Sequence, residues 1–258
     1  INVFLVGDPG TAKSEMLKFC SRIAPRGLYT SGRGSTAAGL TAAVVRDTSG
    51  IFMLEAGAVV LGDQGLVCID EFDKMRPEDR SALHEVMEQQ SASIAKGGIV
   101  ATLNARTSIL AAANPMFGKY DPFKNLTENV NLPIPLLTRF DLIFVVRDIP
   151  QEERDRQIAQ HIISQHGESG TDTTSLIDID ILTKYLSYAK RLDPVLTKGA
   201  ESKIMEFYLK MRSIDGEEKE KMITITPRQL EGLIRLATAR ARLLLKNQVE
   251  EDDADRAI

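Results

Sequence analysis

Apolar and polar positions follow two different patterns in the two parts of this chain. In the first 150 residues, short continuous apolar runs are separated by turn-forming segments, which is typical of buried strands in a parallel sheet. Beyond residue 150, apolar residues recur every three or four positions, as on one face of a helix. The sequence therefore predicts an α/β core over residues 1–150 and an α-helical domain over residues 151–258. The runs expected to form strands of the core sheet are 3–6, 28–30, 66–69, 108–113 and 142–146.

Helical spacing also predicts individual helices. One helix follows the first strand at residues 15–19, and another begins at Pro77, a residue favoured in the first turn, and continues to residue 90. The polar segment 167–174, rich in Gly, Ser and Thr, is expected to be a surface loop within the helical domain. The helices predicted for that domain are 152–166, 178–190, 198–211 and 227–245.

Two β-hairpins are expected to interrupt the α/β core. In each of them, two runs of β-forming residues are joined by a short segment of turn residues. The paired arms are 43–46 with 51–54, joined through 47–50, and 91–95 with 99–103, joined through the tip Lys96-Gly97-Gly98.

The segment after the first apolar run has the composition of a phosphate-binding loop. A bound phosphate requires converging backbone N–H groups, a cation and a hydroxyl for its magnesium ion, which Gly10, Lys13 and Ser14 can supply. The usual pattern G-x-x-x-x-G-K-[ST] has glycine where this chain has Ala12, so the match is incomplete and a plain Gly-Pro turn is the alternative. The residues expected to contact a nucleotide are Asp8, Pro9, Gly10, Thr11, Ala12, Lys13, Ser14 and Glu15.

Two acidic residues, Asp70 and Glu71, follow the apolar run 66–69. A buried strand can place such carboxylates beside the phosphate loop, where Asp70 would hold Mg²⁺ through water and Glu71 would polarise the attacking water. Acids in this position also cap helices, and such a pair arises readily by chance. Because the pair follows the phosphate loop on the next long apolar run, ATP hydrolysis is favoured over a helix cap.

Composition narrows the class of protein. With 258 residues, of which 43% are apolar, the chain can build one sizeable core and a smaller second domain. Its net charge of −4 argues against a surface that binds nucleic acid everywhere, so such a contact is expected from a local basic feature. Cys20 and Cys68 lie in apolar surroundings without metal-ligand spacing, which predicts buried thiols in a reducing compartment. Because Ile1 already lies beside the first apolar run, we expect the chain to be part of a longer protein.

Five motifs combine these features: Gly7-Asp8-Pro9-Gly10-Thr11-Ala12-Lys13-Ser14, Ile69-Asp70-Glu71-Phe72-Asp73-Lys74-Met75, Met87-Glu88-Gln89-Gln90 with Ser93-Ile94-Ala95-Lys96, Ala113-Asn114-Pro115 and Leu137-Thr138-Arg139-Phe140-Asp141-Leu142. Together they resemble the AAA+ domain of the minichromosome maintenance (MCM) replicative helicases, of the archaeal type. Alanine before the phosphate-loop lysine is common in that family, so Ala12 supports the resemblance, which runs nearly end to end.

This resemblance implies a fold and an activity. The fold is a P-loop AAA+ core, a parallel sheet flanked by helices, with two β-hairpin insertions and a C-terminal α-helical lid. The activity is an ATP-driven, magnesium-dependent DNA helicase that works as a ring of six. In it Lys13 binds the β and γ phosphates, Ser14 and Asp70 hold magnesium and Glu71 orients the hydrolytic water.

The resemblance also implies roles for residues outside these two motifs. Asn114 corresponds to the family's first sensor, whose amide would hold the water or the γ-phosphate, although Asn-Pro is also a common turn. Arg139 resembles an arginine finger that reaches the neighbouring subunit's site, and its alternative is an ion pair with Asp141 of the same chain. Arg228 matches the second sensor, which in this family also acts across the subunit boundary, and Gln89 has a weaker claim to such a contact.

DNA contacts are expected on the two hairpins, which in the family project into the central channel that holds a single strand. Lys96 is the cation at the tip of the second hairpin, and Arg46 beside Asp47 is a weaker candidate on the first. A lysine at a hairpin tip is otherwise an ordinary solvated residue.

Two other functions stay open from the sequence. One is a related AAA+ remodelling ATPase, and the other is an ATP-binding structural subunit of a mixed ring. The second is disfavoured because a subunit without turnover need not keep Lys13, Glu71 and Arg139 together. The expected partners are DNA and further copies of the chain, most simply a homohexamer. No apolar run is long enough to cross a bilayer, so the expected location is the cytoplasm or nucleoid of a prokaryote or the nucleus of a eukaryote.

Overall fold

The computed structural model describes residues 1–33, 37–46, 52–96, 98–166, 177–217 and 226–258. Contacts divide the chain into two compact units. The larger unit consists of Val3–Arg139 and Ile143–Thr183, and the smaller consists of Ile1–Asn2, Phe140–Leu142 and Lys184–Ile258. The domain boundary at residue 150 stays a prediction.

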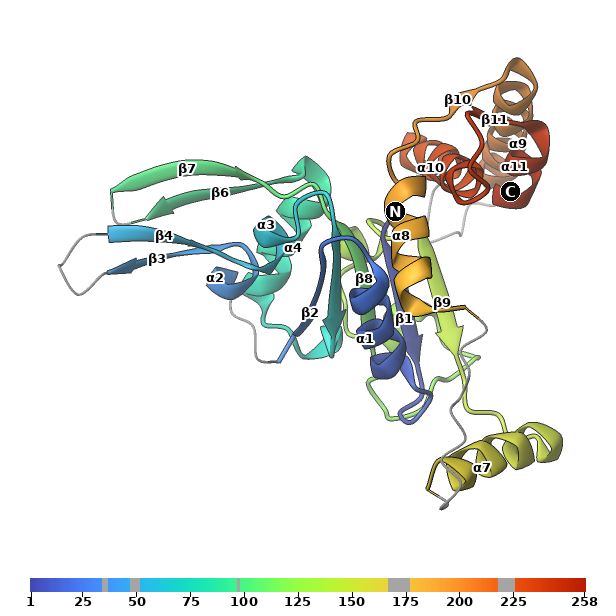
Figure 1. Cartoon of the computed structure of the whole chain (residues 1–258), viewed down its shortest axis with the longest axis horizontal. Helices are drawn as coiled ribbons and strands as arrows, with labels where there is room; N and C mark the ends of the chain where they lie inside the picture. Colours follow the sequence, from blue (N-terminus) through green and yellow to red (C-terminus); the bar gives the residue numbers. More distant parts are fainter. Residues whose placement is uncertain (34–36, 47–51, 97, 167–176, 218–225) are drawn as a thin grey trace. The chain divides into compact units, whose positions relative to one another are not determined.

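Five strands form the central sheet: β1 (Val3–Gly7), β2 (Gly27–Ser31), β5 (Leu66–Asp70), β8 (Ser108–Ala113) and β9 (Leu142–Val146). Their order is β2-β5-β8-β1-β9, and the pairs β2–β5, β5–β8 and β8–β1 are parallel (Figure 1). Phe4, Ile69 and Ala111 on the three inner strands are fully buried. Burial on both faces of the sheet explains why these strands read as continuous apolar runs.

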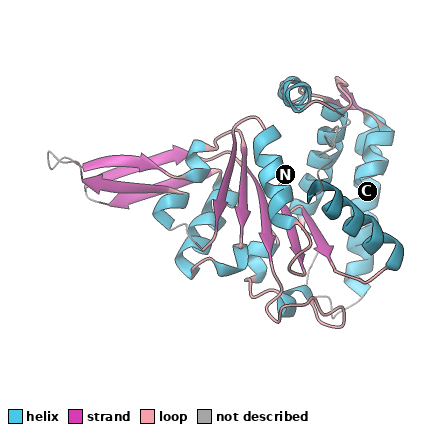
Figure 2. Ribbon diagram, turned by 60° about the horizontal axis from the view of Figure 1, so that its bottom comes forward, coloured by secondary structure: helices cyan, strands magenta, loops and turns pink. Residues whose placement is uncertain are grey.

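Helices flank this sheet in the larger unit (Figure 2). The helix α1 (Lys13–Ile23) buries Leu17 against a cluster formed by alternate sheet residues, among them Leu5 and Cys68. Phe4 lies next to Leu5 on β1, so its side chain points to the other face, where it contacts Phe72 edge to face with ring centroids 5.8 Å apart. The remaining helices of this unit are α2 (Ala37–Leu40), α3 (Ala58–Leu61), a 3₁₀ turn (Phe72–Lys74), α4 (Pro77–Gln89), α5 (Leu126–Asn129), α6 (Ile134–Leu137) and α7 (Glu152–His166).

Both predicted hairpins are present as separate antiparallel pairs that lie side by side (Figure 1). They are β3 (Ala42–Arg46) with β4 (Phe52–Ala56), and β6 (Ser91–Lys96) with β7 (Ile99–Asn104). Lys96 is the last residue of β6 and pairs with Ile99, so it ends a strand where the sequence placed it in the tip. Gly98, just before Ile99, has a φ of +77°, the left-handed conformation that is typical of tight hairpin turns. Residues 47–51 and 97 lie outside the described residues.

The smaller unit is built from helices and one short pair of strands. Ala200, Ile204, Ala237 and Ala241 are central to its core. One helix, predicted to end at residue 211, continues to residue 217, and the last helix was not predicted, because both stretches are polar and lack an apolar period. The elements are α8 (Ile179–Ala189, shared with the larger unit), β10 (Val195–Leu196), α9 (Lys198–Glu217), α10 (Pro227–Leu243), β11 (Gln248–Val249) and α11 (Glu251–Ala257).

Candidate functional site

A cavity of about 360 Å³ lies at the carboxyl ends of β1, β5 and β8. Ligands of open α/β sheets bind at this edge, and the volume is within the usual range for small-molecule sites. The structure therefore brings together the phosphate loop, the acid pair and the residue predicted to be the first sensor. The lining residues are Pro9, Gly10, Thr11, Ala12, Lys13, Ser14, Glu15, Asp70, Glu71, Ala112, Ala113 and Asn114.

The backbone of the phosphate loop turns sharply into α1. Gly10 has a φ of +85° and Ala12, the residue before the helix, has a φ of +59°. A residue with a side chain is about 1–2 kcal/mol less stable than glycine in this left-handed conformation, which explains why the usual motif has glycine where this chain has Ala12. The turn brings the N-terminal end of an eleven-residue helix to the cavity, where its N–H groups and dipole favour an anion.

Lys13 lies in the cavity wall with only 7% of its surface exposed. Its ammonium group donates hydrogen bonds to the carbonyl oxygens of Gly7 (2.8 Å) and Asp8 (2.6 Å) and to the hydroxyl of Thr11 (3.2 Å). Burial lowers the pKa of Lys13, although nearby carboxylates, of which Asp8 contributes most, oppose the shift. An anion in the cavity would favour the charged form further, so this ammonium is suited to a phosphate.

Asp8 was predicted to contact a nucleotide. In the structure its side chain is hydrogen-bonded to two other loops of the protein. Asp8 is 5% exposed, and its carboxylate accepts hydrogen bonds from the backbone N–H of Tyr120 (2.7 Å) and of Asp148 (2.9 Å). Burial alone would raise the pKa of Asp8, but these N–H groups and nearby lysines hold it below its usual range. The charged carboxylate thus ties two loops to the start of the phosphate loop.

The acid pair is oriented by β2, the neighbouring strand. Asp70 accepts hydrogen bonds from the Glu71 N–H (2.8 Å) and the Tyr29 hydroxyl (2.9 Å), and Glu71 accepts one from the Ser31 hydroxyl (3.0 Å). Glu71 itself has a φ of +49°, a strained conformation for a residue with a side chain. Desolvation and the bond to Asp70 raise the pKa of Tyr29 to about 12, so the phenol is a hydrogen-bond donor at neutral pH.

Neither Tyr29 nor Ser31 was predicted as a site residue. They are two residues apart on β2, so their side chains lie on the same face of the strand. The strand register pairs Ser31 directly with Asp70. Asp73, which the sequence placed in a motif without a role, accepts the backbone N–H of Asn114 at 3.1 Å and lies 2.9 Å from Lys74. Asp73 thereby fixes the end of β8, where Asn114 reaches the cavity.

Family comparison decides the classification of this chain. A family model described as "MCM P-loop domain" matches residues 1–166, and one described as "MCM AAA-lid domain" matches residues 180–258. The chain belongs to the MCM family. This confirms the predicted family and its fold, an α/β P-loop core of the AAA+ class with a helical lid, and a P-loop domain is a nucleotide-binding domain.

Several curated MCM proteins are similar to this chain over its whole length. It is 54% identical to the minichromosome maintenance protein MCM of Saccharolobus solfataricus, 50% identical to the DNA replication licensing factor MCM4 of Arabidopsis thaliana and 46% identical to the DNA replication licensing factor mcm7 of Xenopus tropicalis. The chain spans 38%, 31% and 36% of the lengths of these proteins. The relatives' names place the family in DNA replication.

Arg139 and Gln89 of this MCM chain lie near the ends of α6 and α4. Gln89 is the last residue of α4 and is exposed, whereas the Arg139 guanidinium lies 2.7 Å from a carboxylate oxygen of Glu88. The alternative partner, Asp141, forms an ion pair with Arg235 at 2.6 Å and accepts the backbone N–H of Asn2 at 2.8 Å. In the structure Arg139 therefore pairs with Glu88, and Asp141 pairs with Arg235. The roles of Arg139 and Gln89 across a subunit boundary stay predictions.

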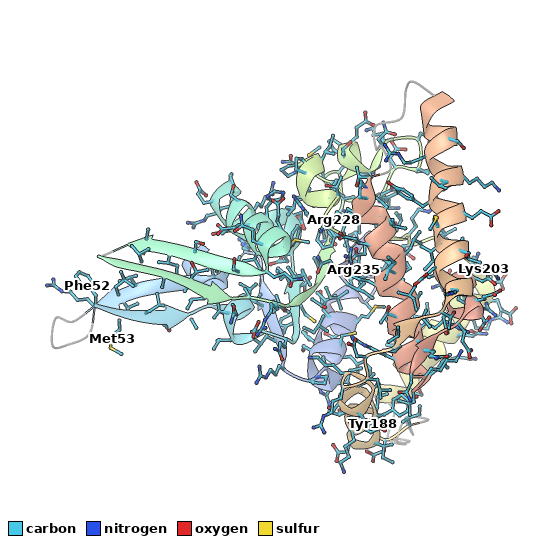
Figure 3. The ribbon with its side chains drawn as sticks, turned by 90° about the horizontal axis from the view of Figure 1, so that it is seen from above. Phe52, Met53, Tyr188, Lys203, Arg228 and Arg235 are labelled. Atoms are coloured by element: carbon cyan, nitrogen blue, oxygen red, sulfur yellow. The ribbon has the colours of Figure 1, made fainter. Side chains whose placement is uncertain are left out.

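Arg228 lies in the first turn of α10, a helix of the lid. Thr226 and Gln229 form a capping box at that start. Arg228 and Arg235 both extend from α10 (Figure 3). Because Arg235 binds the 5% exposed side chain of Asp141, its role is structural, and the sensor role predicted for Arg228 remains a prediction.

The two residues predicted to contact DNA end the first strands of their hairpins. Arg46 pairs across the hairpin with Phe52, and its guanidinium carbon lies 5.4 Å from the centroid of that ring. Phe52 is 48% exposed and lies with Met53 at the outer end of β4 (Figure 3). Lys96 ends β6 opposite Ile99.

The described residues bear on two further predictions. Cys68 is fully buried, burial raises its pKa to about 12, and Cys20 is partly buried beside the same apolar cluster; both are free thiols, as the sequence indicated. Within the described segments, no helix has the length and apolar character needed to cross a membrane.

Proposed function

We propose that this chain is the ATP-hydrolysing motor domain of a hexameric replicative DNA helicase that translocates on DNA and unwinds it. The observation that carries the proposal is that Lys13, Ser14, Asp70, Glu71 and Asn114 line one and the same cavity. It contains a group for each requirement of phosphoryl transfer to water: phosphate binding, metal binding, water activation and a sensor for the γ-phosphate.

The residues of the cavity fit an ATP–magnesium complex. The end of α1 and Lys13 would hold the phosphates, and the Ser14 hydroxyl and Asp70 would hold Mg²⁺, which neutralises charge on the β and γ phosphates when bound. No group of three or more His, Cys, Asp or Glu side chains suited to a metal occurs among the described residues. The Ser14 hydroxyl and the Asp70 carboxylate fit Mg²⁺, because this ion usually takes one or two protein oxygens and completes its shell with phosphate and water.

Hydrolysis in this site would use Glu71 as the base. Its carboxylate would accept a proton from the attacking water while Ser31 holds its second oxygen, and Asn114 would orient the water or the γ-phosphate. The hydrogen bond from Ser31 would keep the Glu71 carboxylate, which lines the cavity, in one orientation.

Tyr29 is expected to tune magnesium binding through Asp70. Tyr29→Phe removes the hydroxyl that fixes the plane of the Asp70 carboxylate, and loss of such an outer-shell partner weakens metal affinity about tenfold or more. We therefore expect the Mg²⁺ concentration for half-maximal ATP turnover to rise about tenfold, with turnover at saturating Mg²⁺ nearly unchanged. Tyr188→Phe, at an exposed tyrosine of α8, is the matched control. An unchanged magnesium titration would contradict this role for Tyr29.

The motor would act as an oligomer, because three of its proposed groups would work across subunit boundaries, and membership of the MCM family favours a ring of six. Arg139, Arg228 and Gln89 would complete the site of a neighbouring subunit, so each active site needs two chains. A homohexamer is the simplest such ring. The relatives include one protein named simply MCM and others numbered MCM4 and MCM7, and the copies in a ring of this protein can be counted by native mass spectrometry.

Lys96 is proposed to contact the phosphate backbone of DNA. Moving one cation per subunit along the phosphate backbone would couple ATP hydrolysis to translocation, so Lys96→Ala in the complete protein should keep basal ATPase and ring assembly but lose unwinding. Equilibrium binding should change little, since one phosphate contact alters the logarithmic salt slope by only about 0.7 on single strands. Lys96→Arg should keep most activity because a phosphate accepts either cation.

The experiment that tests the proposal measures ATP turnover, its stimulation by single-stranded DNA, and unwinding of a forked duplex. Lys210→Ala, at an exposed lysine of α9, controls for the loss of one positive charge. Lack of ATP turnover would identify a structural subunit, and turnover without unwinding by the parent protein would identify a remodelling ATPase. A Lys96→Ala variant that unwinds the fork at the parent rate would make Lys96 an ordinary solvated lysine.

A further inference from the structure

Two side chains of α4 hold the guanidinium of Arg139. Its Nη2 lies 2.7 Å from Oε1 of Glu88, and its Nε donates a hydrogen bond to Nε2 of His84 at 3.3 Å. Nδ1 of His84 in turn lies 4.0 Å from Oε2 of Glu88. Residues four apart on a helix are neighbours on one face, so α4 presents a pair of acceptors to one arginine.

This cluster is partly shielded from water and stands on a fixed helix. The exposed fraction of the side chain is 19% for Arg139, 32% for His84 and 47% for Glu88. A neighbouring face of α4 is anchored in the core through Leu83 and Val86, which are 0% and 2% exposed. Glu88 and His84 therefore act from a backbone that the core holds in place.

A finger residue needs such support for a physical reason. An unrestrained arginine side chain samples many rotamers, and that freedom is lost when its planar fork is brought to a phosphate. A charge-assisted bond at 2.7 Å and a second bond at Nε fix both the direction and the plane of that fork beforehand. Because a displacement of about 1 Å lowers a rate about 10²-fold, orientation of the fork affects turnover directly.

We propose that Glu88, assisted by His84, is a positioning residue that orients Arg139 toward the nucleotide bound by the neighbouring subunit. This inference rests on the proposed action of Arg139 across the interface. A plain surface ion pair is the contrasting possibility, and it would contribute little to folding and nothing to turnover.

Glu88→Ala should lower kcat about tenfold and leave the KM for ATP unchanged, because Arg139 would still be present but free to sample other rotamers. Glu88→Gln should restore most of the lost rate, since its amide oxygen accepts the same hydrogen bond. The matched control is Glu78→Ala, which removes an exposed carboxylate from the first turn of the same helix. Steady-state turnover in the complete protein measures all three, and ring assembly is checked by sedimentation.

A double-mutant cycle separates positioning from any independent effect. If Glu88 acts through Arg139, Glu88→Ala should change single-turnover hydrolysis less than about twofold when Arg139 is already alanine. In rings mixed with Lys13→Ala subunits, the Glu88→Ala defect should be rescued, because some intact nucleotide sites then face an intact Glu88 and Arg139. If both variants fold equally well but Glu88→Ala turns over ATP more slowly than Glu88→Gln, the lost contact with Arg139 is the cause.

The outcomes distinguish the two proposals. Parent turnover in Arg139→Ala would refute the finger itself. A slow Arg139→Ala combined with a Glu88→Ala variant that turns over at the parent rate, or faster, would refute positioning by Glu88 and leave the finger intact. Positioning is likewise refuted if Glu88→Ala slows the Arg139→Ala background as much as it slows the parent.

Discussion

Glu71→Gln is expected to bind ATP with nearly the parent affinity and to hydrolyse it at least about a hundredfold more slowly. The substitution keeps the size of the side chain and leaves the phosphate loop untouched, but an amide cannot accept the proton of the attacking water. General-base catalysis contributes about 10²- to 10⁴-fold, which sets the expected loss. Nucleotide affinity is measured by equilibrium binding of a fluorescent analogue and turnover by phosphate release.

Lys13→Ala is the necessary comparison, because it should fail at the other step. Removing a buried ammonium that is proposed to bind the phosphates should weaken nucleotide binding about 10- to 100-fold. A Glu71→Gln variant with near-parent turnover would exclude Glu71 as the base. Loss of affinity in Glu71→Gln, equal to that in Lys13→Ala, would instead place Glu71 in nucleotide binding.

The nucleotide cavity could be assembled from the sequence because three of its parts follow apolar runs. Parallel strands end at one edge of a sheet, so the segments after β1, β5 and β8 must meet there. Lys13, Asp70 and Asn114 could therefore be placed together without knowledge of the strand order. The hairpins were equally accessible, since turn residues and β-forming arms are local signals.

The residues that orient this chemistry could not be found in the same way. Tyr29 and Ser31 bond to the acid pair only because the sheet places β2 next to β5, although β2 follows β1 in the chain. The pairing of His84 with Arg139 joins residues 55 positions apart through side chains alone. Such contacts depend on register and packing, which leave no periodic trace in a single sequence.

The backbone conformation of Ala12 also could not be predicted from the sequence. Ala12 looked like a departure from the phosphate-loop pattern, and the structure shows that the chain accepts alanine at a φ of +59°, where glycine is easier. Hydrogen bonds from the buried Lys13 ammonium to the carbonyl oxygens of Gly7 and Asp8 close that turn. A local preference of about 1–2 kcal/mol was therefore outweighed by the fold around it.

Arg139→Ala is expected to lower ATP turnover about 10³- to 10⁵-fold, the contribution of an arginine finger to phosphoryl transfer. An intrasubunit ion pair at this position would affect stability by about 0–1 kcal/mol and leave turnover nearly intact. Arg156→Ala, which breaks the exposed pair with Glu152 on α7, is the matched control and should be silent in the same assay. Turnover is measured in the complete protein, with assembly verified by sedimentation.

Mixing subunits then locates the action of Arg139. A Lys13→Ala subunit cannot bind nucleotide well but still offers Arg139, whereas an Arg139→Ala subunit offers only an intact phosphate loop. Head-to-tail rings filled at random from equal amounts pair the two intact halves at about a quarter of their interfaces. Turnover should therefore reappear in the mixture although neither variant is active alone. Mixed rings verified by mass spectrometry that stay inactive would place Arg139 in its own subunit's site, because only an action within one chain is insensitive to the identity of the neighbour.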